Sequence, residues 1–171
     1  FPQFKYSERL KNIKNLDYEL IKKFDSCLIL ALLIVDKSDN YEYFCHKYKT
    51  SNTIKDRLKN ISENFDKLKN IKFFSEKNIK KIIYSSNKTY AKDLVIFSLC
   101  MNKKKNDLNI KKLINYIYTC EIPKFPISGD YLKKYGYETG QLLGNKLKSL
   151  EEKWIENDFM INEEEIKKSL D

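Results

Sequence analysis

The segment Pro123–Trp154, PKFPISGDYLKKYGYETGQLLGNKLKSLEEKW, contains every glycine of the 171-residue chain. Four glycines fall within sixteen residues, after 128 residues without one: Gly129, Gly136, Gly140 and Gly144. Glycine reaches left-handed backbone conformations and lets two backbones approach closely. The concentration therefore indicates a backbone requirement specific to this segment, and we take it as the organising element of the chain.

The same segment predicts two helices joined by a tight turn. Ser128 is a suitable N-cap for a short helix over Asp130–Tyr135, and Gly136 follows where a helix would end in a left-handed residue. Thr139 can cap a second, longer helix. That helix carries one apolar stripe at helical spacing, formed by Leu143, Leu147, Leu150 and Trp154. We therefore predict a helix-hairpin-helix-like element.

The glycines of this element have two interpretations, and both can hold together. In the first, Gly136 ends a helix, while Gly140 and Gly144 lie on one helix face and allow close helix packing. In the second, a glycine-lined turn at a helix N-terminus exposes N–H groups to a phosphate, assisted by the helix dipole. Lysines outnumber acidic residues around the turn: Lys133, Lys134, Lys146 and Lys148 against Asp130 and Glu138.

A family resemblance rests on these residues. The run Gly129-Asp130-Tyr131-Leu132, the later glycines and a charged helix containing Trp154 resemble the C-terminal region of class II tRNA nucleotidyltransferases (CCA-adding enzymes) and bacterial poly(A) polymerases. The resemblance is good over Pro123–Asp158. It is weaker upstream, where Lys49–Asn52 and Arg57-Leu58 are similar to a Leu-Ser-Asn segment of that family.

The chain departs from the family pattern at Tyr131, inside the Gly-Asp-Leu motif, and at Thr139, where proline is usual. The resemblance implies a body and tail that hold tRNA or another RNA, while a separate N-terminal catalytic head of the same protein works with Mg²⁺ and ATP or CTP. The residues expected to contact RNA are Arg57, Lys133, Lys134, Gly136, Thr139, Gly140, Lys146 and Lys148.

The carboxylates that nucleotidyl transfer needs are missing from this chain. The reaction requires paired carboxylates that hold two metal ions, and the family supplies them from an Asp-x-Asp beside a glycine-rich phosphate loop. No Asp-x-Asp occurs, no glycine precedes Gly129, and His46 is the only histidine. We expect no catalytic residue, metal site or cofactor in this chain. Because it begins with Phe1, we expect a longer parent protein, whose head would decide between CCA and poly(A) addition.

The net charge, the cysteines and the apolar runs restrict the partners and the compartment that we expect for this chain. The net charge of +9 suggests a polyanion. Residues 128–171 hold seven lysines against ten acidic side chains, so residues 1–127 carry +12. Four cysteines without a C-x-x-C spacing predict buried structural thiols in a reducing cytoplasm. The longest apolar run, Cys27–Val35, is too short to span a bilayer and predicts a central core helix, with no membrane partner.

Helical periodicity dominates the rest of the chain, which predicts an all-α, multi-helix bundle body (residues 1–122) and a hairpin-containing tail (residues 123–171), packed as one unit. The predicted body and C-terminal helices are Asp17–Val35, Tyr41–Tyr48, one from Ser51 or Asn52 to Phe65, one from Ser75 through Ile83, one from Asn87 or Lys88 to Met101, one from Asp107 to Tyr118, and one from Asn162 to Leu170. The helix after Ser51 is expected to carry Lys55, Arg57 and Lys59 on its outer face, and Lys103–Lys105 to be a solvated loop.

Most tyrosines and phenylalanines fall on the apolar stripes and are predicted core residues; Tyr135 and Tyr137, which flank Gly136, are the exceptions. Two rivals to the RNA-binding hypothesis remain open. One is a structural or dimerisation domain that supports a catalytic head. The other is a DNA-binding helix-hairpin-helix module, because that element grips the phosphates of either polymer.

Overall fold

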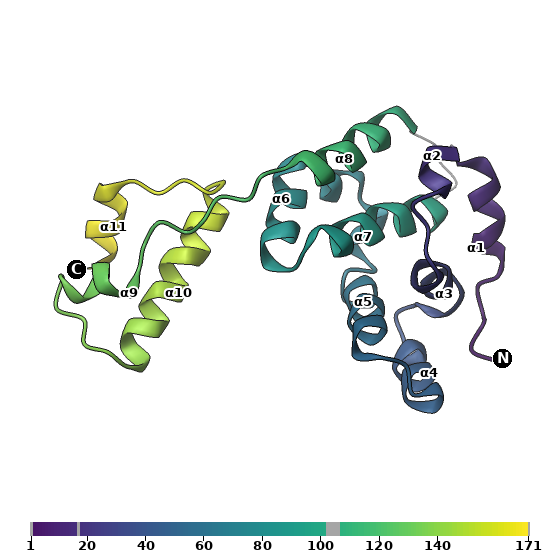
Figure 1. Ribbon diagram of the computed structural model, residues 1–171, viewed down its shortest axis with the longest axis horizontal. Coiled ribbons are helices and arrows are strands. Elements are labelled where there is room, and N and C mark those ends of the chain that lie inside the picture. The colour runs from purple at the N-terminus through teal and green to yellow at the C-terminus, as the bar shows by residue number, and fades with distance from the viewer. Residues whose placement is uncertain (1, 17, 102–106, 171) are drawn as a thin grey trace. The chain divides into compact units, whose positions relative to one another are not determined.

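The computed structural model describes residues 2–16, 18–101 and 107–170 (Figure 1). These residues form eleven α-helices and three short 3₁₀ turns, with no β-strand among them. The predicted all-α, multi-helix fold is therefore confirmed. Within the same residues, no helix is both long enough and apolar enough to cross a membrane.

The chain divides into two compact units, residues 1–120 and residues 121–171, called the body and the tail from here on. The body contains α1 (Glu8–Lys11), α2 (Tyr18–Ile21), α3 (Ser26–Ile34), α4 (Asn40–Tyr48), α5 (Asn52–Glu63), α6 (Glu76–Ser85), α7 (Lys88–Met101) and α8 (Asp107–Thr119). The 3₁₀ turns are Asn12–Asn15, Lys67–Lys69 and Ile71–Phe74. The predicted Lys103–Lys105 loop lies outside the described residues.

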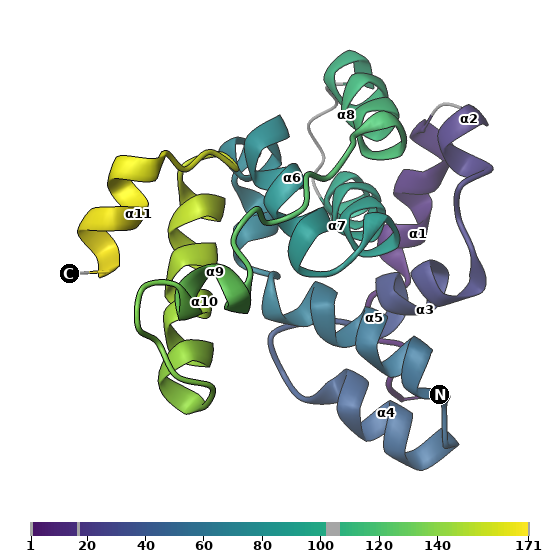
Figure 2. The same ribbon diagram turned by 60° about the vertical axis from the view of Figure 1, so that its left-hand side comes forward.

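Two helices form the centre of the body. α7 packs against α3, α5, α6 and α8, and Figures 1 and 2 both draw it in the middle of this unit. Leu28 and Leu32 of α3 and Phe97 of α7 are fully buried. Both helices are apolar nearly all round, as a helix surrounded by other helices must be.

The predicted single helix over Asp17–Val35 is wrong, because it is interrupted before Ser26. α2 ends at Ile21 and α3 begins at Ser26, while Asp25 adopts an extended backbone, φ −124° and ψ 173°. The Asp25 carboxylate accepts a hydrogen bond from the Leu28 N–H at 2.9 Å, so it caps α3. Apolar spacing continues across the interruption, which is why periodicity alone could not detect it. Asp17, the predicted start, lies outside the described residues.

Serine N-caps begin two other helices where they were predicted. Ser51 Oγ accepts from Ile54 N at 3.4 Å and begins α5, and Ser75 Oγ accepts from Asn78 N at 3.3 Å and begins α6. These short-range hydrogen bonds satisfy N–H groups that have no partner within the helix. Both predicted starts are confirmed.

A buried arginine in the first helix was not foreseen. Arg9 Nη1 donates to the carbonyl oxygens of Val35 at 2.7 Å and of Leu32 at 3.3 Å, at the end of α3. The Tyr6 ring centre lies 3.9 Å from the guanidinium carbon. Arg9 therefore satisfies carbonyls that the helix leaves unpaired and places a cation at the negative end of the helix dipole.

All four cysteines are buried and form no disulfide, which confirms the prediction of buried thiols. Burial raises the pKa of Cys27 to about 11 and that of Cys100 to about 12. Both thiols therefore remain protonated at neutral pH and act as small apolar side chains.

The tail contains α9 (Gly129–Lys133), α10 (Gln141–Glu156) and α11 (Glu163–Leu170). Its small core consists of Ile127, Leu132, Leu150 and Ile166, with Leu143 and Leu147 packed against it. The Trp154 ring lies 5.3 Å from that of Phe125 and 4.9 Å from that of Phe159, centre to centre. The predicted apolar stripe of the longer helix therefore faces inward, as expected.

Candidate nucleic-acid interface

The first half of the hairpin has the predicted N-cap and glycine turn, although α9 ends at Lys133 instead of Tyr135. Ser128 Oγ accepts from Tyr131 N at 3.2 Å, so Ser128 is the N-cap of α9. Gly136 has φ +87°, in the left-handed region, and its N–H donates to the Lys133 carbonyl at 3.1 Å. The turn after α9 therefore depends on a glycine at this position.

The second half differs from the prediction at Thr139. The residue that precedes α10 as its N-cap is Gly140, with φ +154° and ψ −165°, and it has no side chain to cap the helix. The prediction that Thr139 caps this helix is wrong. The physical reason is that Gly140 takes a backbone conformation that favours glycine, which delays the helix until Gln141.

Close packing occurs at a different glycine from the predicted pair. A Cβ added to Gly140 or Gly144 would meet no described atom within 4 Å, so the packing interpretation of these two residues is wrong. A Cβ on Gly129 would lie 3.4 Å from Leu143 Cδ2 and 3.9 Å from Leu147 Cδ1. The start of α9, rather than an interior position of α10, is where a small residue accommodates the neighbouring helix.

The four predicted lysines lie on both sides of the turn. Lys133 and Lys134 are exposed at the end of α9, and Lys133 Nζ lies 3.0 Å from Asp130 Oδ1. Lys146 Nζ, on α10, lies 5.8 Å from the centre of the Tyr137 ring, and Lys148 is exposed farther along the same helix. The hairpin thus presents lysine amines around its turn, one of them already paired with a carboxylate.

The tyrosines beside the turn differ in their surroundings. Tyr135 is exposed, and its ring lies 5.2 Å from that of Tyr131 at an interplanar angle of 39°. The two hydroxyl oxygens are 3.3 Å apart, and this hydrogen bond raises the pKa of Tyr131. Tyr137 is partly buried against the tail core. Of the two predicted exceptions, Tyr135 therefore lies clearly at the surface.

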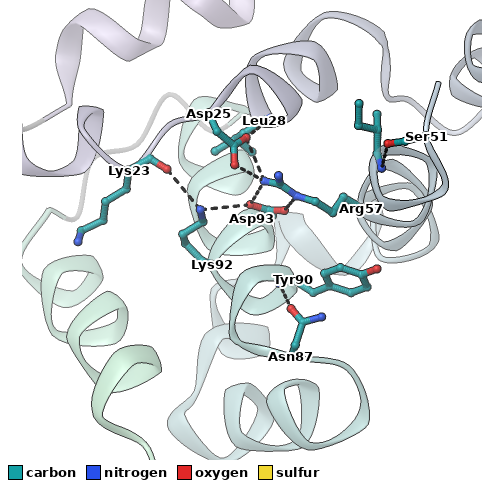
Figure 3. A network of polar contacts seen from close by, with 10 residues as sticks. Lys23, Asp25, Leu28, Ser51, Arg57, Asn87, Tyr90, Lys92 and Asp93 are labelled. Carbon is teal, nitrogen blue, oxygen red and sulfur yellow. Dashed lines mark hydrogen bonds and ion pairs between the residues drawn. The ribbon is translucent and has the colours of Figure 1, made fainter. Parts of the chain in front are cut away.

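Arg57 lies inside the body, not on the outer face of its helix (Figure 3). Its Nε donates to Asp93 Oδ2 at 2.7 Å and its Nη2 to Asp93 Oδ1 at 2.9 Å, a two-point ion pair between α5 and α7. Nη2 also lies 2.8 Å from Asp25 Oδ2, at the start of α3. The side chains of Arg57 and Asp93 are only 11% and 1% exposed. The outer-face prediction is wrong, because α5 turns this position toward the two helices that carry its partners.

The electrostatics of this ion-pair network follow from burial. Burial alone would lower the pKa of Arg57, but hydrogen bonds and charge from Asp93 and Asp25 raise it. Burial raises the pKa of Asp93 despite those bonds, whereas the pKa of Asp25 is lowered, since the Leu28 N–H and Arg57 outweigh its burial. The guanidinium remains charged and joins three helices.

Sequence reasoning missed this network, although one signal was present. Asp93 lies between Ala91 and Leu94, in the middle of the apolar helix α7, and a carboxylate at such a position needs a partner. The chain has only two arginines, Arg9 and Arg57, so the choice of partner was narrow. Because both arginines face inward, the positive side chains on the body surface are lysines.

No three His, Cys, Asp or Glu side chains within residues 2–16, 18–101 and 107–170 come together as a metal site would require. The groups that the described part of the candidate interface presents are lysine amines, backbone N–H groups and tyrosine rings.

Comparison with known proteins gives one partial similarity and no family-wide match. No protein-family model matches the chain. A stretch of 59 residues is 32% identical to the mitochondrial CCA tRNA nucleotidyltransferase 1 of Danio rerio. The matched stretch is 34% of this chain and 14% of the length of that protein. This similarity supports a relation between part of the chain and the tRNA nucleotidyltransferases.

Proposed function

We propose that this chain is an RNA-holding region of a protein related to the tRNA nucleotidyltransferases, and that its RNA is tRNA. The observation that carries the proposal is the partial similarity to the zebrafish enzyme, which is named for action on tRNA. The catalytic head, with its Mg²⁺ and ATP or CTP, would lie in another part of the same protein. We also propose that the protein is located in the cytoplasm, because its cysteines are buried thiols typical of a reducing compartment.

The charge of the body supports RNA binding. Residues 1–120 carry +12 and residues 121–171 carry −3, when lysines and arginines are counted against carboxylates. The arginines are engaged with Asp93 and with the end of α3, so lysines would provide the contacts to phosphate. Lysine is a mobile point charge that neutralises phosphates without reading bases. The proposed recognition is therefore of backbone shape and charge.

The hairpin is the proposed second contact. Its turn residues Gly136, Thr139 and Gly140 are solvent-accessible, and they precede the first N–H groups of a sixteen-residue helix. A helix N-terminus of this length carries partial positive charge that favours a phosphate. Its basic side chains would come from Lys133, Lys134, Lys146 and Lys148. Arg57 would act indirectly, by fixing α5, whose Lys55 and Lys59 are exposed.

A salt series tests this proposal. Binding of fluorescently labelled tRNA to the full chain should weaken linearly in log–log with salt, by about 0.7 to 0.9 per phosphate neutralised. The double variant Lys133→Glu, Lys134→Glu should weaken binding and reduce the slope by about one to two. Lys167→Glu, Lys168→Glu is the matched control, because it reverses an adjacent exposed pair on α11 of the same unit.

Three outcomes separate the rivals. Equal losses in the hairpin and control variants would leave the hairpin as a packing element only. Duplex DNA that competes as well as tRNA would favour the DNA-binding module. No binding of tRNA at low salt would overturn the proposal and favour a structural or dimerisation domain, which sedimentation would then examine.

A further inference from the structure

Two exposed tyrosines of the body each have a lysine amine above the ring. Tyr18 of α2 is 69% exposed, and Lys22 Nζ lies 4.5 Å from its ring centre. Tyr118 of α8 is 49% exposed, and Lys23 Nζ lies 4.5 Å from its ring centre. Lys22 and Lys23 are consecutive in the chain, and Lys88 Nζ donates to the Tyr118 carbonyl. We call these five residues the tyrosine–lysine patch (Tyr18, Lys22, Lys23, Lys88 and Tyr118).

The patch is held in place by the interior of the body. Lys92 is only 14% exposed; its Nζ lies 3.9 Å from Asp93 and donates to the Lys23 carbonyl at 3.4 Å, as Figure 3 shows. Lys88 Nζ donates to the Tyr118 carbonyl at 2.7 Å, at the end of α8. The buried Arg57 network thus extends to the backbone that carries Lys23.

Charge indicates an anionic occupant. The patch has three lysines, and Glu19 forms an ion pair with one of them, Lys22, at 3.0 Å. The neighbouring carboxylates of Asp25 and Asp93 are already paired with Arg57. These three carboxylates are therefore each paired, and Lys23 and Lys88 place further positive charge beside Tyr118.

We propose that the tyrosine–lysine patch binds single-stranded RNA, with unpaired bases stacked on Tyr18 and Tyr118 and phosphates neutralised by Lys22 and Lys23. An exposed aromatic ring stacks any base, and a base within a duplex cannot reach it. Lysines alone would suit duplex and single strand equally, so the rings give the preference for unpaired nucleotides. This inference deepens the proposed function and rests on it.

A second aromatic surface of the body provides the control. Tyr43 on α4 is 55% exposed, but Lys47 Nζ lies 5.8 Å from its ring centre, farther than in the patch. No described contact ties it to the Arg57 network. Substitution of Tyr43 therefore removes an exposed tyrosine of similar type without touching the patch.

The test measures binding of a labelled oligoadenylate of about ten nucleotides to the full chain by fluorescence anisotropy, a length within the usual site size of single-strand binders. Tyr18→Ala and Tyr118→Ala should each weaken binding about five- to a hundredfold, the typical loss of one stacked base. Tyr18→Phe and Tyr118→Phe keep the ring and should stay within about twofold of wild type. Tyr43→Ala should have no effect.

The outcomes distinguish this inference from the proposed function. If the alanine variants bind oligoadenylate as wild type does, while the hairpin double variant still weakens tRNA binding, the patch is excluded and the proposed function stands. If Tyr43→Ala weakens oligoadenylate binding as much as Tyr118→Ala does, the patch has no special role in binding. If wild-type chain binds neither tRNA nor oligoadenylate at low salt, both proposals fall.

Discussion

The body and the tail are both helical but are held together differently. Polar side chains join distant parts of the body: Tyr6 bonds to Asp36, Asn12 to the Cys100 carbonyl, and Arg57 to Asp93. Side-chain hydrogen bonds of the tail include pairs of near neighbours, such as Ser128 with Tyr131. The body depends on a few specific long-range polar contacts in addition to its core, and the tail on the small apolar core of Ile127, Leu132, Leu150 and Ile166.

This difference can be measured, because the only tryptophan of the chain is in the tail. Trp154 is 2% exposed, so its fluorescence will report unfolding of the tail. Far-UV circular dichroism will report mainly the body, which contains eight of the eleven described α-helices. Two signals in one urea titration therefore follow the two units separately.

The largest expected change in stability follows from loss of the buried ion pair. Asp93→Asn removes the main partner of Arg57 inside the body and should cost about 3–5 kcal/mol of unfolding free energy. The circular dichroism midpoint should fall and the Trp154 midpoint should stay. Asp130→Asn is the control, because it breaks an exposed ion pair with Lys133 and should move neither midpoint. A parallel fall of both signals in Asp93→Asn would mean that the two units unfold together.

A cavity in the tail should produce the opposite pattern. Leu132 is fully buried in the tail core, and Leu132→Ala should cost about 2–4 kcal/mol there. We expect the fluorescence midpoint to fall while most of the circular dichroism change keeps its midpoint. Unchanged fluorescence would show that the cluster of Ile127, Leu132, Leu150 and Ile166 does not limit the stability of the tail.

Two glycine substitutions in the tail should have opposite signs. Gly136→Ala places a side chain at φ +87° and should destabilise the tail by about 1 kcal/mol. Gly144→Ala lies inside α10 where a Cβ meets no described atom, and should stabilise it by about 0.5–1 kcal/mol. The Trp154 midpoint in urea checks both. A loss of stability in Gly144→Ala would restore the packing interpretation of that residue.

The smallest effect concerns the pH dependence of the body. Burial alone would raise the pKa of Asp36, but hydrogen bonds from Ser38 and Tyr6 lower it below its ordinary value. A lowered pKa in the folded state gives stability that is complete above the unfolded pKa of about 3.9 and is lost as pH falls through the folded pKa. Asp36→Asn should remove the part of the stability loss at acid pH that comes from this carboxylate.

The measurement compares circular dichroism midpoints in urea at several pH values in the acid range. The raised pKa of Asp93 acts in the opposite direction in both proteins, so the difference between wild type and Asp36→Asn isolates Asp36. Identical pH slopes would show that folding leaves the pKa of Asp36 unchanged, which would contradict the prediction.

Local chemistry made part of this structure predictable. Ser51, Ser75 and Ser128 cap helices through N–H groups three residues away, and Gly136 ends one through its own φ angle. Arg57 could not be placed in this way, because Asp25 and Asp93 are 32 and 36 residues distant and meet it only after three helices pack. Whether a residue on a helix faces solvent is decided by such neighbours.

Two further errors concern where a helix begins, because the residue pattern fits more than one starting point. Thr139 and Gly140 are both acceptable residues before a helix, and the observed φ of +154° at Gly140 decides between them. The apolar spacing of Ile21, Phe24 and Leu28 fits one continuous helix as well as two, so the Asp25 cap could not be recognised from periodicity. In both cases the backbone conformation of one residue determines where the helix begins, and the pattern of residue types does not specify that conformation.

The inward position of both arginines has a consequence for chemical modification. The positive side chains on the outside of this chain are primary amines, whereas its guanidinium groups are engaged inside the body. Acetylation removes the charge of an amine and does not react with a guanidinium. An acetylating reagent or enzyme could therefore reverse the sign of the surface stepwise while leaving both internal arginine contacts intact, which would make the affinity for a polyanion adjustable without unfolding the chain.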